Sequence, residues 1–283
     1  MQPFIAAAIM PQRSMPVGAF VCHPSMTPSP DSSQQNESAP ARRTRLVEAR
    51  QIQRRASTSG QYLLHPANFA LYAGERAVLT GPSGSGKSVF LRALALLDPL
   101  DGGEVLWRGT PVARQNIPRF RRHIAYVRQR PALVDGSVED NLRYPYSLAV
   151  YRDVAFDAAR AGALLEAAGR PADFPGRDAS ELSGGEAQIV ALVRVLQLDP
   201  DALLLDEPTA SLDPESARAV EALVSGWFER ARTARATVWV SHDPAQAARV
   251  GNRHLTMKAG VLDADTGPAT ARMSPPAGGG VLR

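Results

Sequence analysis

The sequence predicts an α/β fold with a helical segment inserted into it, and three features support this prediction. Short apolar strands alternate with helical patterns along the middle of the chain, as they do when helices cover a sheet. The stretch from about Val138 to Gly169 is instead helical throughout. Residues 1–42 and 267–283 show no such periodicity and are rich in small and turn-forming residues. We therefore expect one folded domain over 43–266, between a disordered N-terminal extension and a flexible C-terminal tail.

The elements of the α/β part follow from local patterns. Arg76 to Thr80 is predicted to be a short strand, followed by a helix from Ser88 to Leu97. Ala202 to Leu205 is an apolar run of the length of a buried strand, and Thr237 to Val240 is another. The inserted helical subdomain is expected at about 132–180, because this stretch is rich in alanine and holds no convincing strand.

Composition limits the classes of function. A chain of 283 residues with 44% hydrophobic and 21% charged residues is long enough for one well-packed domain. No apolar run approaches the roughly 18 to 20 residues of a membrane-spanning helix. The single cysteine, Cys22, excludes an intrachain disulfide framework and a cysteine metal cluster, which suits a reducing compartment. The net charge of +4 is spread along the chain, so we expect a solvated surface and no nucleic-acid partner.

A glycine-rich loop lies between the first predicted strand and the helix after it. This phosphate loop matches the pattern G-x-x-x-x-G-K-[ST] with Gly81, Pro82, Ser83, Gly84, Ser85, Gly86, Lys87 and Ser88. Its backbone N–H groups and the helix N-terminus are suited to phosphate, Lys87 to the β- and γ-phosphates, and Ser88 to Mg²⁺. Only one other lysine, Lys258, occurs in the chain. A plain Gly/Ser loop is the alternative, and the flanking strand and helix favour nucleotide binding.

Two carboxylates, Asp206 and Glu207, follow the apolar strand that ends at Leu205. Such a strand end is costly unless a cation or a reacting water lies beside it. Asp206 is placed to hold Mg²⁺ through water, and Glu207 to deprotonate the water that attacks the γ-phosphate. A helix-capping acid after a strand is the alternative, and the phosphate loop makes it the weaker one.

A second anion site is predicted at Leu182-Ser-Gly-Gly-Glu186, which precedes an apolar-rich helical pattern. Ser183, Gly184 and Gly185 would form its N-terminal anion site. An alternative from the residues alone is a helix cap, with Ser183 as N-cap and Glu186 completing a capping box.

This pentapeptide resembles the signature of ABC ATPase subunits and, as in that family, lies 23 positions before Asp206. The resemblance covers about residues 44–265 and extends to Gln129, Asp213 and His242, in the family order. Taken alone, a glutamine is more often a surface residue, an aspartate before proline a turn or helix cap, and a histidine after a strand a structural hydrogen bonder. The resemblance implies a P-loop NTPase (RecA-like) core with an inserted α-helical subdomain and an antiparallel β portion, and hydrolysis of ATP with Mg²⁺.

Several roles are implied by this resemblance alone. Gln129 would sense Mg²⁺ and the attacking water, and His242 would hydrogen-bond the γ-phosphate. Ser183, Gly184, Gly185 and Asp213 would act in trans, within a head-to-tail homodimer. A separate integral-membrane permease would bind the helical segment, which implies a peripheral position on the cytoplasmic side of the cell membrane. Many family members also stack adenine on an aromatic residue some 20 or more positions before the phosphate loop, where only Tyr62 is nearby.

The stretch from Tyr126 to Tyr146 looks like the FetA-type subunits, which implies iron export with a FetB-type permease. Phosphate or amino-acid uptake subunits are the nearest alternatives, because the permease selects the cargo. Three other classes are disfavoured. DNA-repair ATPases separate the two anion sites by long coiled coils, whereas Ser88 and Ser183 are 95 positions apart. Ribosome-associated factors carry two cassettes in one chain, and only one is present here. Non-hydrolytic modules lack the catalytic base, which Glu207 supplies here.

Overall fold

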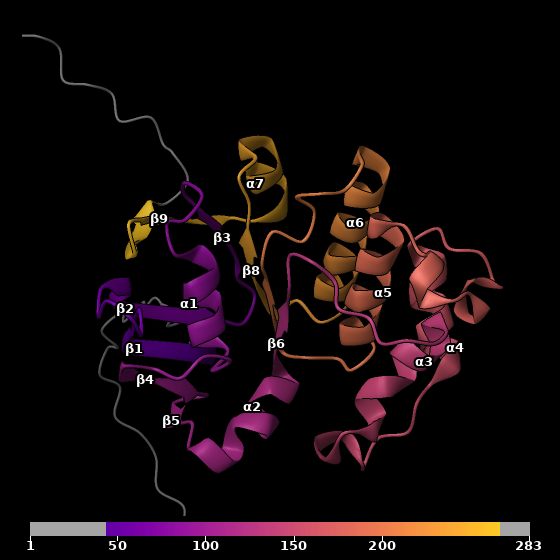
Figure 1. Cartoon of the computed structure of the whole chain (residues 1–283), viewed down its shortest axis with the longest axis horizontal. Helices are drawn as coiled ribbons and strands as arrows, with labels where there is room; N and C mark the ends of the chain where they lie inside the picture. Colours follow the sequence, from indigo (N-terminus) through magenta and orange to yellow (C-terminus); the bar gives the residue numbers. More distant parts are fainter. Residues whose placement is uncertain (1–43, 267–283) are drawn as a thin grey trace, which may run out of the picture. The chain divides into compact units, whose positions relative to one another are not determined.

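The computed structural model describes residues 44–266, so the expectations for residues 1–42 and 267–283 lie outside the described residues. The described residues contain two β-sheets together with the helices that pack on them (Figure 1). The smaller has the order β2-β1-β4-β5, and its strands are β1 (Arg45–Arg55), β2 (Tyr62–Tyr72), β4 (Gly102–Trp107) and β5 (Thr110–Pro111). Its neighbouring strands are all antiparallel, which confirms the antiparallel β portion.

The larger sheet has the order β10-β9-β3-β8-β7-β6. Its strands are β3 (Arg76–Thr80), β6 (Ile124–Val127), β7 (Ala202–Leu205), β8 (Ala236–Val240), β9 (Arg253–Lys258) and β10 (Val261–Thr266). All neighbours are parallel except β9 and β10. Leu205 pairs with Val127 on one side and Trp239 on the other, so the strands end at one common edge. Segments that follow four neighbouring strands therefore meet there.

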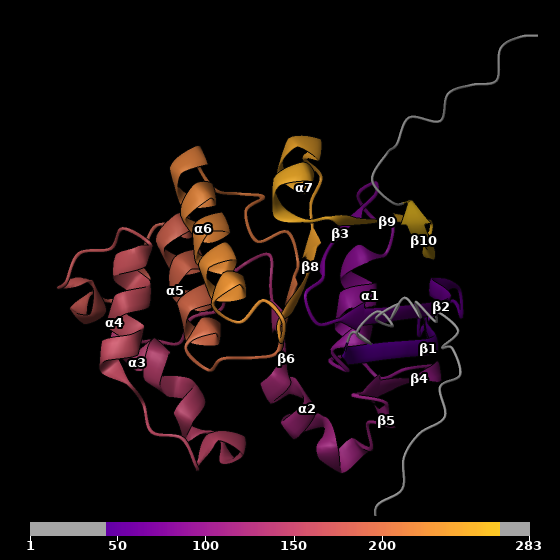
Figure 2. The same ribbon diagram turned by 180° about the vertical axis from the view of Figure 1, so that it is seen from behind.

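Alternation along the central strands produces two cores, one on each face of the larger sheet. Leu204 and Val238 pack with α1 (Lys87–Leu94) and the antiparallel sheet, whereas Leu203 and Trp239 face the opposite way. On that second face lie α5 (Gly184–Leu196) and α6 (Pro214–Arg230), side by side in Figures 1 and 2. The remaining helices are α2 (Ile117–His123), α3 (Val138–Arg143), α4 (Ala158–Ala167) and α7 (Pro244–Val250). This arrangement confirms the predicted α/β class.

The predicted helical segment contains α3, α4 and short 3₁₀ turns, including Tyr144–Ser147 and Ala149–Tyr151. Its helices pack against α5 through Val138, Leu142 and Leu165. A capping box begins α3, in which the Ser137 hydroxyl accepts the Asp140 N–H and the Asp140 carboxylate accepts the Ser137 N–H. No helix within residues 44–266 has both the length and the apolar character needed to cross a bilayer.

One predicted boundary was wrong. The helix expected over Ser88–Leu97 begins one residue earlier and ends at Leu94. Leu96 adopts a left-handed backbone conformation, with a φ of 54°, which an α-helix does not allow. The run of leucines continues past this turn, so the apolar pattern extends beyond the helix.

Candidate nucleotide site

The phosphate loop connects β3 to α1 and curls tightly against the end of β9. At Gly81 the φ is 148°, and a Cβ atom there would lie 2.1 Å from the carbonyl oxygen of Met257. Only glycine fits this approach. The Lys87 Nζ donates to the carbonyl oxygens of Gly81 and Pro82, at 3.0 and 2.9 Å. Burial lowers the pKa of Lys87, and the charges of Glu207 and Asp206 act against that shift.

Asp206 lies at the end of β7 and is 4% exposed. Its Oδ1 accepts a hydrogen bond from the Ser88 hydroxyl at 2.9 Å, so two of the three residues predicted at the Mg²⁺ site are in contact. Its Oδ2 accepts one from the Tyr126 hydroxyl at 2.8 Å. Burial and the Asp206 carboxylate both raise the pKa of Tyr126, which keeps it a neutral donor.

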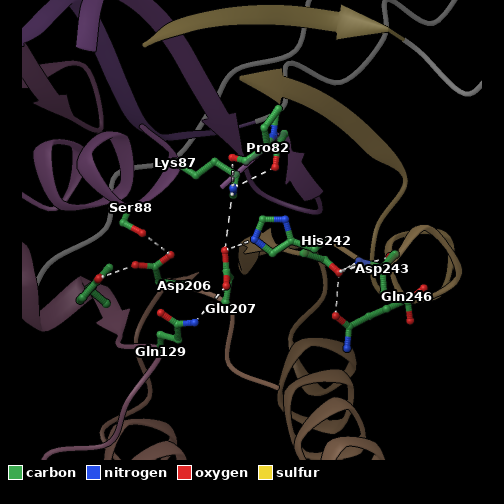
Figure 3. Close-up of polar contacts among 12 residues, drawn as sticks. Pro82, Lys87, Ser88, Gln129, Asp206, Glu207, His242, Asp243 and Gln246 are labelled. Atoms are coloured by element: carbon green, nitrogen blue, oxygen red, sulfur yellow. Dashed lines mark hydrogen bonds and ion pairs between the residues drawn. The ribbon is translucent and has the colours of Figure 1, made fainter. Parts of the chain in front are cut away.

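Glu207 is the point where three other predicted residues, Lys87, Gln129 and His242, meet (Figure 3). Its carboxylate contacts the His242 Nε2, accepts a hydrogen bond from the Gln129 Nε2 at 3.0 Å and lies 3.8 Å from the Lys87 Nζ. These partners follow β8, β6 and β3, respectively. Glu207 has a φ of 47°, a conformation that bulky residues rarely adopt, and such strain is found at functional sites. The cluster can therefore hold a carboxylate in place to accept a proton from water.

The signature segment lies apart from this cluster, at the N-terminus of α5. Ser183 is the N-cap, and Glu186 completes the capping box that was the alternative from the residues alone. A Cβ at Gly185 would lie 2.5 Å from the Ser216 Oγ on α6, and Asp213 caps that helix. The signature and Asp213 are thus neighbours. Within residues 44–266, no hydrogen bond or ion pair joins Ser183 or Asp213 to the phosphate loop.

A cavity of about 630 Å³ extends from the phosphate loop to Tyr62, Leu63 and His65 on β2. The Tyr62 ring stacks on His65, with centroids 4.6 Å apart, and the Arg55 guanidinium lies 4.1 Å from the Tyr62 centroid. Tyr62, the aromatic residue expected near adenine, thus lines this cavity and already contacts Arg55 and His65. Its part in adenine recognition stays a prediction.

Sequence reasoning missed two residues beside the site. Tyr126 lies three positions before Gln129 and carries the hydroxyl that holds Asp206. Gln246, on α7, is 7% exposed and binds the loops that follow β7 and β8. A polar residue on a short helix gives no sign in the sequence that its partners lie elsewhere. For Tyr126, the single signal is its place at the end of a strand beside the acidic one.

Comparison with known proteins agrees with this geometry. The chain matches the ABC transporter family model over residues 64–210. Protein STAR1 of Oryza sativa is 37% identical over 76% of this chain, an alignment that spans 60% of STAR1. The probable iron export ATP-binding protein FetA of Escherichia coli is 35% identical, over 64% of this chain and 78% of FetA. The phosphate import protein PstB 2 of Natronomonas pharaonis is 37% identical, over 77% of this chain and 78% of PstB 2.

A solved structure is similar as well. The dimeric post-hydrolysis structure of the ATP-binding cassette MJ0796, bound to ADP and Pi, aligns with a TM-score of 0.68. The two chains are 27% identical, and the alignment covers 77% of this chain and 98% of the MJ0796 chain. FetA and PstB 2 are about equally similar to this chain, so the similarity extends to the family and not to one cargo. The chain belongs to the ABC transporter family, as an ATP-binding subunit that hydrolyses ATP.

Proposed function

We propose that this chain hydrolyses Mg²⁺-ATP at the Glu207 cluster and thereby energises transport through a separate membrane permease. The observation that carries the proposal is the convergence of Lys87, Gln129 and His242 on one carboxylate. Lys87 and the loop N–H groups bind the phosphates, and Glu207 accepts the proton of the attacking water. Gln129 and His242, which both contact Glu207, orient that carboxylate and the water.

Ser88 and Asp206 fit a magnesium site. Their oxygens lie 2.9 Å apart beside the phosphate loop, and Mg²⁺ prefers a few oxygen ligands together with substrate phosphates. When bound, the ion would supply charge neutralisation at the β- and γ-phosphates. Gln129 lies on the other side of Asp206 from Ser88, where it donates to Glu207 (Figure 3).

The signature completes the site from a second copy. Ser183, Gly184 and Gly185 offer an N-terminal anion site on a helix of 13 residues, yet within one described chain they do not contact the phosphate loop. A head-to-tail dimer brings this helix end to the nucleotide held by the partner, and Asp213 lies next to it. The dimeric state of the MJ0796 structure supports this arrangement.

The decisive experiment replaces Glu207 by Gln, which keeps the shape of the side chain and removes the base. We expect ATP turnover to fall by at least about 100-fold, in line with loss of a general base. ATP should still bind, and the dimer should accumulate in light scattering. Turnover at the normal rate would refute the assigned mechanism.

A groove of about 1010 Å³ between the larger sheet and the helical segment is suited to the permease. Four of the six exposed large hydrophobic side chains of residues 44–266 line it, namely Leu97, Val134, Tyr144 and Leu148. Six arginines also line it, against one carboxylate, Asp206. We therefore infer an apolar docking segment with acidic residues on the permease. Membership of the family adds the proposal of a peripheral location on the cytoplasmic side of the membrane.

Co-purification with the membrane permease tests this docking. Leu148→Asp places a charge in the groove and should abolish co-purification. Val261→Asp is the matched control, since Val261 is equally exposed but lies on β10, outside the groove. Equal recovery of the permease with both variants would refute the docking site.

For the cargo, we propose metal export, with iron as the metal. The Tyr126 to Tyr146 resemblance and the identity to FetA support it, whereas the identity to PstB 2 favours phosphate import as the second candidate. Vesicles that contain the permease and this subunit separate the two, because ATP should drive ⁵⁵Fe or ³²P-phosphate across the membrane. Movement of phosphate alone would overturn the export proposal, and so would a neighbouring gene for a periplasmic binding protein.

A further inference from the structure

Glu186, at the end of the signature, carries two sets of contacts. Its Oε2 accepts the Ser183 N–H at 2.9 Å, and its own N–H donates to the Ser183 Oγ at 3.3 Å. Its Oε1 accepts a hydrogen bond from the Arg177 Nη1 at 2.8 Å, and the Arg170 Nη1 lies 3.8 Å away. The backbone hydrogen bond from Ser183 lowers the pKa of Glu186, and Arg177 lowers it further. Glu186 is therefore ionised at neutral pH.

The helical segment holds Arg177 in this position. Its guanidinium lies 5.5 Å from the ring centroid of Phe174, which is fully buried, and its carbonyl oxygen accepts the Val138 N–H at 2.9 Å. Arg170 approaches the same ring, at 5.9 Å. Two cations thus lie beside one carboxylate, Glu186, in the first turn of α5.

A carboxylate at this place presents an electrostatic conflict. The capping box needs an oxygen acceptor at position 186, and both Glu and Gln supply one. A negative charge in the first turn favours the helix itself, but it opposes the approach of a multiply charged phosphate to the same turn. The hydrogen bonds of Glu186 to Ser183 leave its net charge unchanged, so only a cation can remove the conflict.

We propose that Arg177 is a positioning residue that neutralises Glu186, so that the signature can receive the phosphates of a nucleotide held by a second copy of this chain. This inference rests on the proposed head-to-tail dimer and specifies what its signature requires. Arg170 contributes less to this neutralisation, because its Nη1 lies 3.8 Å from the Glu186 Oε1, against 2.8 Å for Arg177. The pair acts on ATP-driven dimerisation and leaves nucleotide binding by a single chain unaffected, because neither residue contacts the phosphate loop.

The test measures dimerisation with ATP in the Glu207→Gln background, by sedimentation velocity over a range of protein concentrations. Arg177→Met keeps an unbranched side chain beside Phe174 and removes the charge, and it should weaken dimerisation by about tenfold. Adding Glu186→Gln should return the dimer affinity to that of Glu186→Gln alone, because the amide oxygen still caps Ser183. Arg177→Lys should retain most of the affinity, and binding of a fluorescent ATP analogue to the monomer should be equal in all variants.

The outcomes separate the charge from a structural role. Arg177→Met with the dimer affinity of its parent would overturn the proposal. A weakened dimer that Glu186→Gln does not restore would overturn it as well, since a packing defect is indifferent to the charge at position 186. A Glu207→Gln parent that stays monomeric with saturating ATP would instead refute the head-to-tail dimer of the proposed function, and this inference with it.

Discussion

Gln246 joins the two loops that carry Glu207 and His242, and its replacement is the sharpest test of how the site is held together. Its Oε1 accepts a hydrogen bond from the Ser241 hydroxyl at 2.8 Å, and Ser241 is one residue before His242. Its Nε2 donates to the Thr209 Oγ1, two residues after Glu207, and to the Glu221 Oε1, both at 2.8 Å. The Gln246 side chain therefore holds the loop that carries Glu207 at a fixed distance from the loop that carries His242.

The cost of Gln246→Leu can be estimated from these contacts. The leucine fills a similar volume and makes none of the three hydrogen bonds, each worth about 1 kcal/mol. Glu221 keeps its ion pair with Arg249 at 3.1 Å, so no carboxylate is left unpaired. We expect a loss of about 3 kcal/mol, or about 6 to 12 °C in Tm for a domain of this size. The kcat should fall by about tenfold, with KM within about twofold, because the phosphate loop is untouched.

A charge swap distinguishes a specific network from general packing. Gln246→Glu alone would place two carboxylates in hydrogen-bonding contact and should be worse than Gln246→Leu. The double variant Gln246→Glu/Glu221→Gln reverses donor and acceptor and should recover most of the kcat. Calorimetry and steady-state ATPase kinetics measure both effects. A Gln246→Leu protein with normal Tm and kcat, or a swap no better than Gln246→Glu, would refute the reasoning.

Two further predictions concern Asp206 and Asp201. Tyr126→Phe removes the donor to the Asp206 Oδ2 and should raise the Mg²⁺ concentration for half-maximal ATPase activity by about tenfold; an unchanged Mg²⁺ requirement would contradict this. Burial acts to raise the pKa of Asp201, but the hydrogen bonds and charges of His123 and Arg108 outweigh it and hold the pKa below its usual value. Its stabilising contribution is thus present above about pH 4 and is lost as the pH falls through the folded pKa. Asp201→Asn should flatten the acid side of a urea-unfolding profile, and parallel profiles for the two proteins would contradict this.

Much of the nucleotide site was predictable because its parts are local. The phosphate loop lies between a strand and a helix, and Asp206 and Glu207 follow a strand of four buried residues, so short stretches of sequence show both. Parallel strands end at one edge, and the predicted residues at those ends therefore meet. The capping box of Ser183 and Glu186 also lies within four residues, and both partners were identified.

The rest depends on contacts that local patterns do not contain. Gln246 binds Thr209 and Glu221, which are 37 and 25 positions away, and Arg177 reaches Glu186 across a turn of irregular backbone. Their partners are fixed by how α6, α7 and the helical segment pack. The end of α1 was also missed, because a left-handed residue such as Leu96 leaves no sign in an apolar run. The proposed trans role of the signature is intermolecular, so no single chain displays it.

The two halves of the proposed composite site are held by different means, and this gives the groove its importance. Glu207 is fixed by partners from three other strand ends, whereas Ser183 depends on α5 and on the helical segment packed against it. The groove borders the first half directly and the support of the second, because Ser88, Gln129 and Asp206 line one part of it and Tyr144, Leu148 and Arg194, on the helical segment and α5, line another. A docking segment bound there would contact the phosphate-loop half and the helical segment at once. Its binding energy can therefore favour one placement of the signature relative to the phosphate loop, which is the thermodynamic requirement for coupling a partner to ATP hydrolysis.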